Sequence, residues 1–346
     1  MTLLLIFEAQ KDGKFQWDDM ITVSEYAASM GGSQVFLEPE EQQTAKNMVK
    51  CIAVASANDA SVAMAEFIGG SEEGFVAMMN EKAKEIGCEN TFFITPNGLD
   101  AELETGGTQK QHSCTAADLA AIMRYCAFMS PQKETFLTIT RTASRQFCSL
   151  KKAQDGTFET GARTVSAANH NAFLQMMDGM LSGKTGFTGK AGYCFVGAAK
   201  KNGITLTSCV LASGWPPNKS FKWSDTKSLM DYGFFYFQKT PLPVQNLALA
   251  KIPVKDGKKK FVSLKPIIPK ETLTASFDSL KIVYRIPTAL CAPIRKNTPI
   301  GSISFYINNK LFQKTEVFPS ESIEKSCFSD TIKQVLNQWM DIFCLS

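Results

Sequence analysis

Apolar residues recur at helical spacing through roughly the first 130 residues of the chain. Between Thr44 and Ala55 the apolar positions include Met48 and Ile52, a spacing typical of a helix with one buried face. Three more segments predict helices on the same grounds, namely Asp59–Phe67, Ser71–Ile86 and Thr115–Met129. The first third of the chain is therefore predicted to be mainly helical.

The periodicity changes after about residue 134. Phe136–Thr142 alternates between apolar and polar positions and predicts a strand. Tyr193–Ala199 and Ile204–Ala212 are also strand-like, and Asn202-Gly203 between them is typical of a two-residue β-hairpin turn. Helical spacing returns in Ser224–Phe237. Together these segments predict helices packed with an antiparallel sheet.

A change in composition at Thr240-Pro241-Leu242-Pro243 predicts a domain boundary. Beyond it, short strand-like runs are separated by prolines and by turn signals at Asp256-Gly257 and Asn308-Asn309. The end of the chain places apolar residues on one face of a helix from Phe328 to Leu345. We therefore expect three parts: a large domain over 1–245, a small β domain over 246–327 and an amphipathic helix over 328–346.

Composition and charge narrow the class of protein. The 346 residues are 44% hydrophobic and 20% charged, which is ordinary for a soluble globular chain. Lysine and arginine number 37 against 33 acidic residues, so the net charge of +4 is too small and dispersed to indicate a nucleic-acid partner. No apolar run approaches the length of a membrane span, and Leu3–Phe7 lacks the flanks of a signal peptide.

Two residue counts restrict the chemistry. The only histidines are His112 and His170, which excludes a metal site built from several histidines. The ten cysteines include no C-x-x-C pair, so zinc-ribbon and thioredoxin-like sites are not indicated. Most cysteines lie in apolar stretches, where they are expected to pack as small buried hydrophobic residues in a reducing or anoxic setting.

Two short motifs could carry chemistry. Lys184-Thr185-Gly186 begins a strand, where an edge could pair with an extended substrate, the lysine and threonine could bind a carboxylate, and the glycine would leave room for close approach. A solvated lysine beside a strand glycine is the alternative. Ser56-Ala57-Asn58 lies between two helices, where it could be a simple helix N-cap or a set of catalytic groups held inside a helical domain.

The order of these motifs resembles that of penicillin-binding proteins and β-lactamases, in which S-x-x-K precedes an S-D-N-like element and then K-T-G. The likeness is closest to serine-type D-Ala-D-Ala carboxypeptidases, the low-molecular-weight penicillin-binding proteins, and it extends over essentially the whole chain. The segments that carry it are Met1–Ala9, Ala55–Ala60, Thr95–Asp100, His112–Leu119 and Gly183–Tyr193.

This resemblance implies a fold and a reaction. The fold would be an α/β (α+β) penicillin-binding or β-lactamase-like domain, followed by a small β-sandwich and a terminal helix that docks on a membrane surface or packs on the β domain. The substrate would be a peptidoglycan stem peptide ending in D-Ala-D-Ala, with β-lactams as inhibitors and no metal or cofactor. Such a protein would work outside the cytoplasm, at the cell envelope.

The resemblance also implies a role for each site residue. Ser56 would relay a proton toward the departing D-alanine, and Asn58 would orient the substrate amide. Lys184 and Thr185 would bind the terminal carboxylate, with Gly186 beside them. These residues are predicted to converge on one cleft although they are far apart in the sequence.

One departure from the family concerns the nucleophile. In the family, the nucleophilic serine and its lysine precede the position that corresponds to Met1. The four S-x-x-K matches in this chain follow Ser56, in the wrong order, and are interpreted as coincidences: Ser130–Lys133, Ser149–Lys152, Ser224–Lys227 and Ser322–Lys325.

Residues 1–346 as given are therefore expected to be inactive. A chain begun at an internal methionine, a non-catalytic peptidoglycan-binding homologue, a β-lactamase and a purely structural cell-surface module remain as alternatives.

Overall fold

The computed structural model describes residues 1–152, 158–242, 251–266, 271–330 and 332. It divides into two units, Met1–Phe235 and Tyr236–Ser346. The proline-rich segment predicted the division at 245, but the strand before it, Phe237–Pro241 (β10), pairs with Glu271–Ala275 (β13) of the second unit. The change in composition indicates where the prolines lie, but it gives no information about which strands pair.

The first unit contains helices α1 to α9, apart from the last residue of α9, and α1, α2, α3 and α5 pack against a largely buried one, Asn58–Gly69 (α4). Small residues such as Ala60 and Ala63 let its neighbours approach on several sides. The other helices are α1 (Thr2–Lys11), α2 (Glu25–Ala28), α3 (Ala45–Lys50) with a π-helical extension (Cys51–Ala55), α5 (Glu72–Ile86), α6 (Ala116–Arg124) with a π-helical extension (Tyr125–Met129), α7 (Lys133–Thr140), α8 (Phe173–Met176) and α9 (Phe221–Tyr236).

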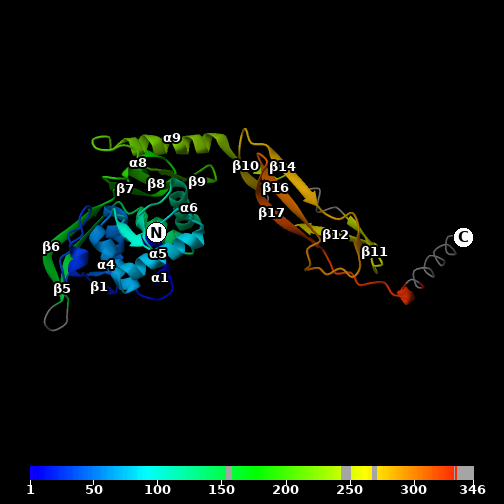
Figure 1. Cartoon of the computed structure of the whole chain (residues 1–346), viewed down its shortest axis with the longest axis horizontal. Coiled ribbons are helices and arrows are strands. Elements are labelled where there is room, and N and C mark those ends of the chain that lie inside the picture. Colours follow the sequence, from blue (N-terminus) through cyan, green and yellow to red (C-terminus); the bar gives the residue numbers. More distant parts are fainter. Residues whose placement is uncertain (153–157, 243–250, 267–270, 331, 333–346) are drawn as a thin grey trace. The chain divides into compact units, whose positions relative to one another are not determined.

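A three-stranded antiparallel sheet lies between two helical layers of this unit (Figure 1). Its strands are β7 (Met180–Thr188), β8 (Gly192–Lys201) and β9 (Ile204–Val210). Val196 and Ala198 face the helical core that includes α1, α4 and α6, whereas Phe195 and Ala199 face the layer that contains α9. Alternate side chains of β8 therefore pack on the two helical layers. Because β8 also pairs with β7, it holds the strand that carries Lys184-Thr185-Gly186 between these layers.

Two smaller sheets complete the first unit. One joins four strands in the order β1-β2-β5-β6 and the other is the hairpin β3-β4. The bounds of these strands are β1 (Met20–Thr22), β2 (Gln42–Thr44), β3 (Glu102–Thr105), β4 (Thr108–Gln111), β5 (Ser144–Lys152) and β6 (Phe158–Ala168).

The predicted helices are confirmed in their described parts, and so is the β8–β9 hairpin. Thr115 caps α6 by accepting the amide hydrogen of Asp118, and Ser71 caps α5 in the same way. Asn202 and Gly203 both have positive φ, as a type I′ turn requires.

One predicted strand is wrong, because Phe136–Thr142 lies mostly in helix α7. Its buried residues Phe136, Ile139 and Thr140 follow a helical spacing, and Phe136 packs edge-on against Phe7 of α1 with ring centroids 6.1 Å apart. The run of β-branched residues favoured a strand locally, but burial against α1 overrides that preference.

The second unit is a β domain in its described residues. A six-stranded sheet has the order β14-β16-β17-β12-β11-β15, and β10 pairs with β13 separately. Asn308 and Asn309 form the predicted turn between β16 and β17, both with positive φ. The strands not yet given are β11 (Lys251–Lys255), β12 (Phe261–Pro266), β14 (Leu280–Arg285), β15 (Leu290–Cys291), β16 (Gly301–Ile307) and β17 (Lys310–Pro319).

Two sequence expectations reach the limits of this description. Residues 328–330 and 332 are helical, but the rest of the predicted amphipathic helix over 328–346 lies outside the described residues. Within the described residues, no helix combines the length and the apolar character that a membrane span requires.

Of the nine described cysteines, all without disulfides, only Cys51, Cys88 and Cys126 are buried, so the expectation that most are buried is wrong.

Candidate active site

Ser56 lies between two buried helical segments. The π-helical turn Cys51–Ala55 ends at this residue, and α4 begins two residues later. Ser56 has φ 58° and ψ 39°, a left-handed conformation that is uncommon for residues other than glycine and recurs at functional sites. No side chain caps α4, so the interpretation of Ser56-Ala57-Asn58 as a simple helix N-cap is wrong.

Lys184 of β7 reaches Ser56 across the interior of the unit. Its Nζ donates to Ser56 Oγ at 2.7 Å and to the carbonyl oxygen of Thr185 at 2.8 Å. The predicted convergence of Ser56 and Lys184 is therefore confirmed, although 128 positions separate them in the sequence. This hydrogen bond connects the junction of α3 and α4 to the edge of the sheet.

The electrostatic state of Lys184 follows from its position. Burial disfavours the charged ammonium and lowers the pKa of Lys184 from 10.5 to about 8. At pH 7 the ammonium therefore remains mostly charged, and it loses its charge at a lower pH than an ordinary lysine does. Such a group can attract a carboxylate at neutral pH.

Four of the five predicted site residues line a cleft of about 780 Å³. Ser56, Asn58, Thr185 and Gly186 all contribute to its wall, together with Gly98 and Leu99 from another loop. A smaller, mainly apolar cavity of about 200 Å³ adjoins it and is lined by Lys184, Ser56, Asn58 and the first residues of α1. All five predicted residues thus border one connected region of the first unit.

Strand β7 presents an edge to this region. In the described part of the chain it pairs only with β8, so its other edge is open to an extended peptide. A Cβ added at Gly186 would meet only Cys194 Cβ, at 3.7 Å, which is an ordinary contact. The protein's own packing therefore does not require a glycine there, and Gly186 lines the cleft that a ligand would enter.

Asn58 holds the loop that forms another part of the wall. Its Nδ2 donates to the carbonyl oxygen of Gly31 at 2.7 Å, and its backbone N–H donates to that of Ser33 at 2.8 Å. Gly32, between them, has φ +78°, and a Cβ there would lie 2.8 Å from Asn58 Nδ2. The close approach of Asn58 to this loop therefore requires glycine.

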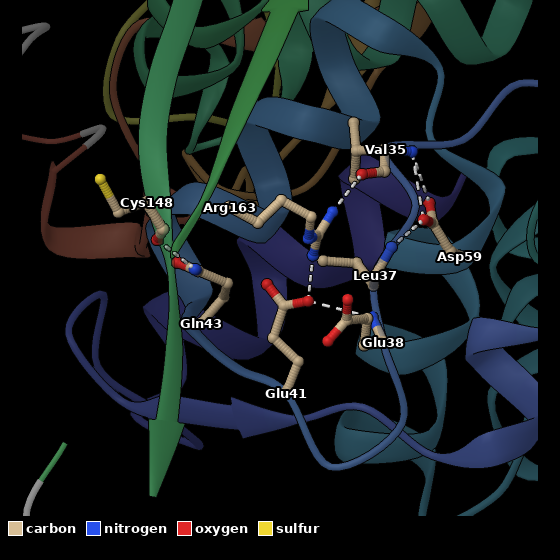
Figure 2. Close-up of polar contacts among 8 residues, drawn as sticks. All are labelled: Val35, Leu37, Glu38, Glu41, Gln43, Asp59, Cys148 and Arg163. Carbon is tan, nitrogen blue, oxygen red and sulfur yellow. Dashed lines mark hydrogen bonds and ion pairs between the residues drawn. The ribbon is translucent and has the colours of Figure 1, made fainter. Parts of the chain in front are cut away.

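Asp59 extends the same anchoring, and sequence analysis missed it (Figure 2). Its fully buried carboxylate accepts the backbone N–H groups of Val35 at 3.1 Å and Leu37 at 3.0 Å. Because a buried N–H without a partner is costly, this carboxylate fixes the path of the chain just after the loop at Gly32. The only sequence feature that could have indicated this role is the position of Asp59 directly after Asn58.

A partly buried ion pair lies beside this segment. Arg163 of β6 pairs with Glu41, whose side chain is fully buried, and donates from Nη1 to the carbonyl oxygen of Val35 at 3.0 Å (Figure 2). Glu41 also accepts the N–H of Glu38 at 3.0 Å. The four-stranded sheet thus supports the segment that Asp59 holds from the other side.

Three further basic residues, His170, Lys219 and Lys222, line the cleft and were not assigned to it from the sequence. Lys222 at the start of α9 is 8% exposed, and its Nζ lies 4.5 Å from the ring centroid of Tyr193. Burial lowers the pKa of Lys222, and the nearby positive charge of Lys219 lowers it further. His170 lines the same cleft, and burial and Lys184 lower its pKa. Nothing in the local pattern around Lys222 distinguishes it from other lysines.

The side chains in this region suit an anion more than a metal. Lys184, Lys219 and Lys222 border it, and in the described ranges no group of three or more His, Cys, Asp or Glu side chains could hold a metal ion. The arrangement can bind a carboxylate and pass a proton between a lysine and a serine hydroxyl.

Comparisons with known proteins agree in both units. A family profile described as D-alanyl-D-alanine carboxypeptidase matches residues 1–214, and one described as the C-terminal domain of penicillin-binding protein 5 matches residues 237–325. D-alanyl-D-alanine carboxypeptidase DacF of Bacillus subtilis is 35% identical over 98% of this chain and 82% of its own length. DacA of Escherichia coli is 29% identical over 98% and 80%.

Solved structures show the same fold. Penicillin-binding protein 5 of Haemophilus influenzae superposes with a TM-score of 0.71 at 24% identity, covering 94% of this chain and 88% of that one. The Streptomyces K15 DD-transpeptidase gives a TM-score of 0.55 at 24% identity, over 68% of this chain and 86% of that one.

We predict that Asp59→Ala destabilises the first unit by on the order of 3 kcal/mol, because it leaves the N–H groups of Val35 and Leu37 buried without acceptors. Equilibrium urea denaturation of the whole chain measures this. Asp231→Ala, which removes an exposed ion pair with Lys227, is the matched control and should cost about 1 kcal/mol or less. Equal effects of the two substitutions would contradict the anchoring role of Asp59.

Proposed function

The chain belongs to the D-alanyl-D-alanine carboxypeptidase family, and we propose that its cleft binds peptidoglycan stem peptides ending in D-Ala-D-Ala for release of the terminal D-alanine through an acyl-enzyme. The observation that carries the proposal is the 2.7 Å hydrogen bond from Lys184 Nζ to Ser56 Oγ beside the open edge of β7. It places a cation for a terminal carboxylate next to a hydroxyl that can move a proton.

The stem peptide would lie along β7. Its backbone would pair with the strand edge, and its terminal carboxylate would accept hydrogen bonds from Lys184 and from the hydroxyl of Thr185. The lack of strain at Gly186 supports this placement, since a glycine that packing does not need leaves space for the peptide. Lys222 adds positive charge to the same cleft.

Ser56 would act on the leaving group. Its hydroxyl accepts a hydrogen bond from Lys184, so its own hydrogen can be donated to the nitrogen of the departing D-alanine. The proton that the lysine of the nucleophile removes from the serine would replace it, and Lys184 would keep its charge. Asn58 would orient the substrate amide and, through its bond to Gly31, would keep the opposite wall in place. The reaction as proposed uses these groups, the nucleophilic serine with its lysine, and a water molecule that hydrolyses the acyl-enzyme.

The nucleophile of this reaction would come from a Ser-x-x-Lys segment that continues α1 toward its N-terminus. Residues three apart lie on one face of a helix, so this serine and its lysine would point together. Met1 and Thr2 line the same cavity as Lys184, which supports this direction of entry. The serines of the four S-x-x-K matches do not line the cavities that Ser56 and Lys184 border.

The cellular setting is also part of the proposal. Stem peptides lie outside the cytoplasm, so the protein would act at the cell envelope. The apolar positions between 328 and 346 support contact of that segment with a membrane surface. Its polar positions carry Lys333 but also Asp330 and Asp341, so this face is poor in positive charge.

We expect residues 1–346 to form no stable acyl-enzyme with a fluorescent penicillin, because removing a nucleophile costs several orders of magnitude in rate. The same chain extended by a Ser-x-x-Lys segment continuous with α1 should be labelled and should release D-alanine from a D-Ala-D-Ala peptide. Denaturing gel electrophoresis and a D-alanine assay provide the measurements. Labelling of residues 1–346 would place the nucleophile elsewhere, and a folded but inactive extended chain would favour a peptidoglycan-binding protein without catalysis.

In the extended protein, Lys184→Ala and Ser56→Ala should act differently. Loss of the charge-assisted carboxylate contact should lower kcat/KM roughly 10- to 150-fold, whereas loss of the proton relay should lower kcat by about 10²-fold or more. Steady-state kinetics separates the two effects. The matched controls are Lys200→Ala for the lysine and Ser224→Ala for the serine, since both residues are exposed. Identical changes in KM and kcat for both variants would contradict the division of roles.

Affinity of residues 1–346 for a D-Ala-D-Ala peptide should fall as the pH rises through about 8, because Lys184 then loses its charge. The fall should approach tenfold per pH unit at its steepest, since one proton is lost per site. Calorimetric titrations between pH 6.5 and 9.5 measure it. Lys184→Arg keeps its charge over this range and should show a smaller pH dependence than the wild type, with Lys222 still able to titrate. An affinity of the wild type that stays constant above pH 8 would contradict the assignment.

A further inference from the structure

The segment from Phe92 to Leu99 contributes to the wall of the candidate site, and one histidine binds the backbone at its centre. His112 Nδ1 lies 3.1 Å from the backbone nitrogen of Ile94 and 3.2 Å from that of Thr95, and it accepts both N–H groups. The hydroxyl of Thr95 lies 3.3 Å from the same atom and also 3.2 Å from the carbonyl oxygen of Leu99. A single ring nitrogen thus satisfies two adjacent backbone donors.

This geometry requires a particular form of the imidazole. A neutral imidazole has one acceptor nitrogen, so Nδ1 can accept only while the ring proton is on Nε2. A proton on Nδ1 would point at two N–H donors, and the Thr95 hydroxyl would be its one nearby acceptor. Protonation therefore removes both bonds to the wall and adds a repulsive contact.

The surroundings of His112 act on its charge in opposite directions. Burial disfavours the imidazolium, and the nearby carboxylate of Asp100 favours it; burial is the larger effect and lowers the pKa of His112 below 6.5. Phe93 packs edge-on against the ring with centroids 5.6 Å apart. The other titratable groups lining the cavity on this side are Lys184, Lys190, Cys114 and Cys194.

The held segment is connected to the reacting groups. The carbonyl oxygen of Pro96 accepts the hydroxyl of Thr2, the first residue of α1, at 2.5 Å. Asn97 and Gly98 line the cleft together with Ser56. A displacement of residues 94–98 would therefore move the cleft wall and free the start of α1.

We propose that His112 is a positioning residue, whose neutral Nδ1 holds residues 94–98 against the site and releases them when the ring is protonated. The wall would then be ordered near neutral pH and loosened in acid. Since the folded ring is harder to protonate than the unfolded one, this contribution is complete above about pH 6.5 and is lost as the pH falls below it. The consequence for a stem peptide rests on the function proposed above, whereas the order of the wall does not.

Amide hydrogen exchange on residues 1–346 between pH 7.5 and 4.5, corrected for intrinsic rates, tests the proposal. The amides of Ile94 and Thr95 should lose about tenfold or more in protection in acid, since each loses its hydrogen-bond acceptor. The neighbouring amide of Phe93 is the internal control, because it donates at 2.8 Å to Asn80 Oδ1, which does not titrate. The same pH dependence at all three amides would overturn the proposal.

Two variants separate positioning from a merely structural role. His112→Asn keeps an uncharged acceptor near the position of Nδ1 and should retain protection with little pH dependence, while His112→Leu should expose both amides at every pH. If His112→Leu fails to fold, ¹⁵N shifts of the wild-type ring decide, and a proton on Nδ1 at pH 7.5 would overturn the proposal. A wild-type pH profile in His112→Asn would do the same.

A peptide-binding measurement keeps this inference apart from the proposed function. Affinity of the wild type for a D-Ala-D-Ala peptide should decline below about pH 6.5, and that of His112→Asn should not. Absence of peptide binding at every pH would overturn the proposed function, while the exchange result would still decide the role of His112.

Discussion

The hydrogen bond between Lys184 and Ser56 is the contact on which the candidate site depends. It joins the edge strand of a sheet to the junction of two helices, and the two residues belong to separate parts of the sequence. A lysine in this position needs a polar partner, because burial alone penalises its charge, as the lowered pKa of Lys184 shows. Ser56 and the carbonyl oxygen of Thr185 both accept from this lysine, and Ser56 is the partner that comes from a distant part of the chain.

Around this contact, short polar side chains fix backbone that has no regular secondary structure. Asn58 binds the loop at Gly32, Asp59 binds Val35 and Leu37, and His112 binds Ile94 and Thr95. Each gives a partner to backbone groups of a loop, and the N–H groups that Asp59 accepts belong to the buried residues Val35 and Leu37. The cleft is therefore bounded by loops that owe their positions to single side chains, and the effect of a substitution should depend on how many backbone groups it leaves unpaired.

Helical periodicity predicted the helices of the first third, and the turn residues Asn202-Gly203 predicted the hairpin, because both patterns are local in the sequence. The order of the motifs predicted that Ser56 and Lys184 meet. It mispredicted Phe136–Thr142, where burial against α1 outweighed β-branched residues. It could not predict the left-handed Ser56, the carboxylate of Asp59 as an anchor or Lys222 in the cleft. Each of these depends on which distant backbone or ring lies opposite, which spacing along the chain does not encode.

The central claim is that Ser56, Lys184 and the edge of β7 form one cleft for a peptide ending in D-Ala-D-Ala. A crystal structure of the chain with such a peptide tests it most directly. The account predicts the peptide paired with β7, its terminal carboxylate within hydrogen-bond distance of Lys184 or Thr185, and Ser56 Oγ beside the last peptide nitrogen. A peptide bound elsewhere, or Ser56 and Lys184 separated in the complex by more than a bridging water could span, would contradict it.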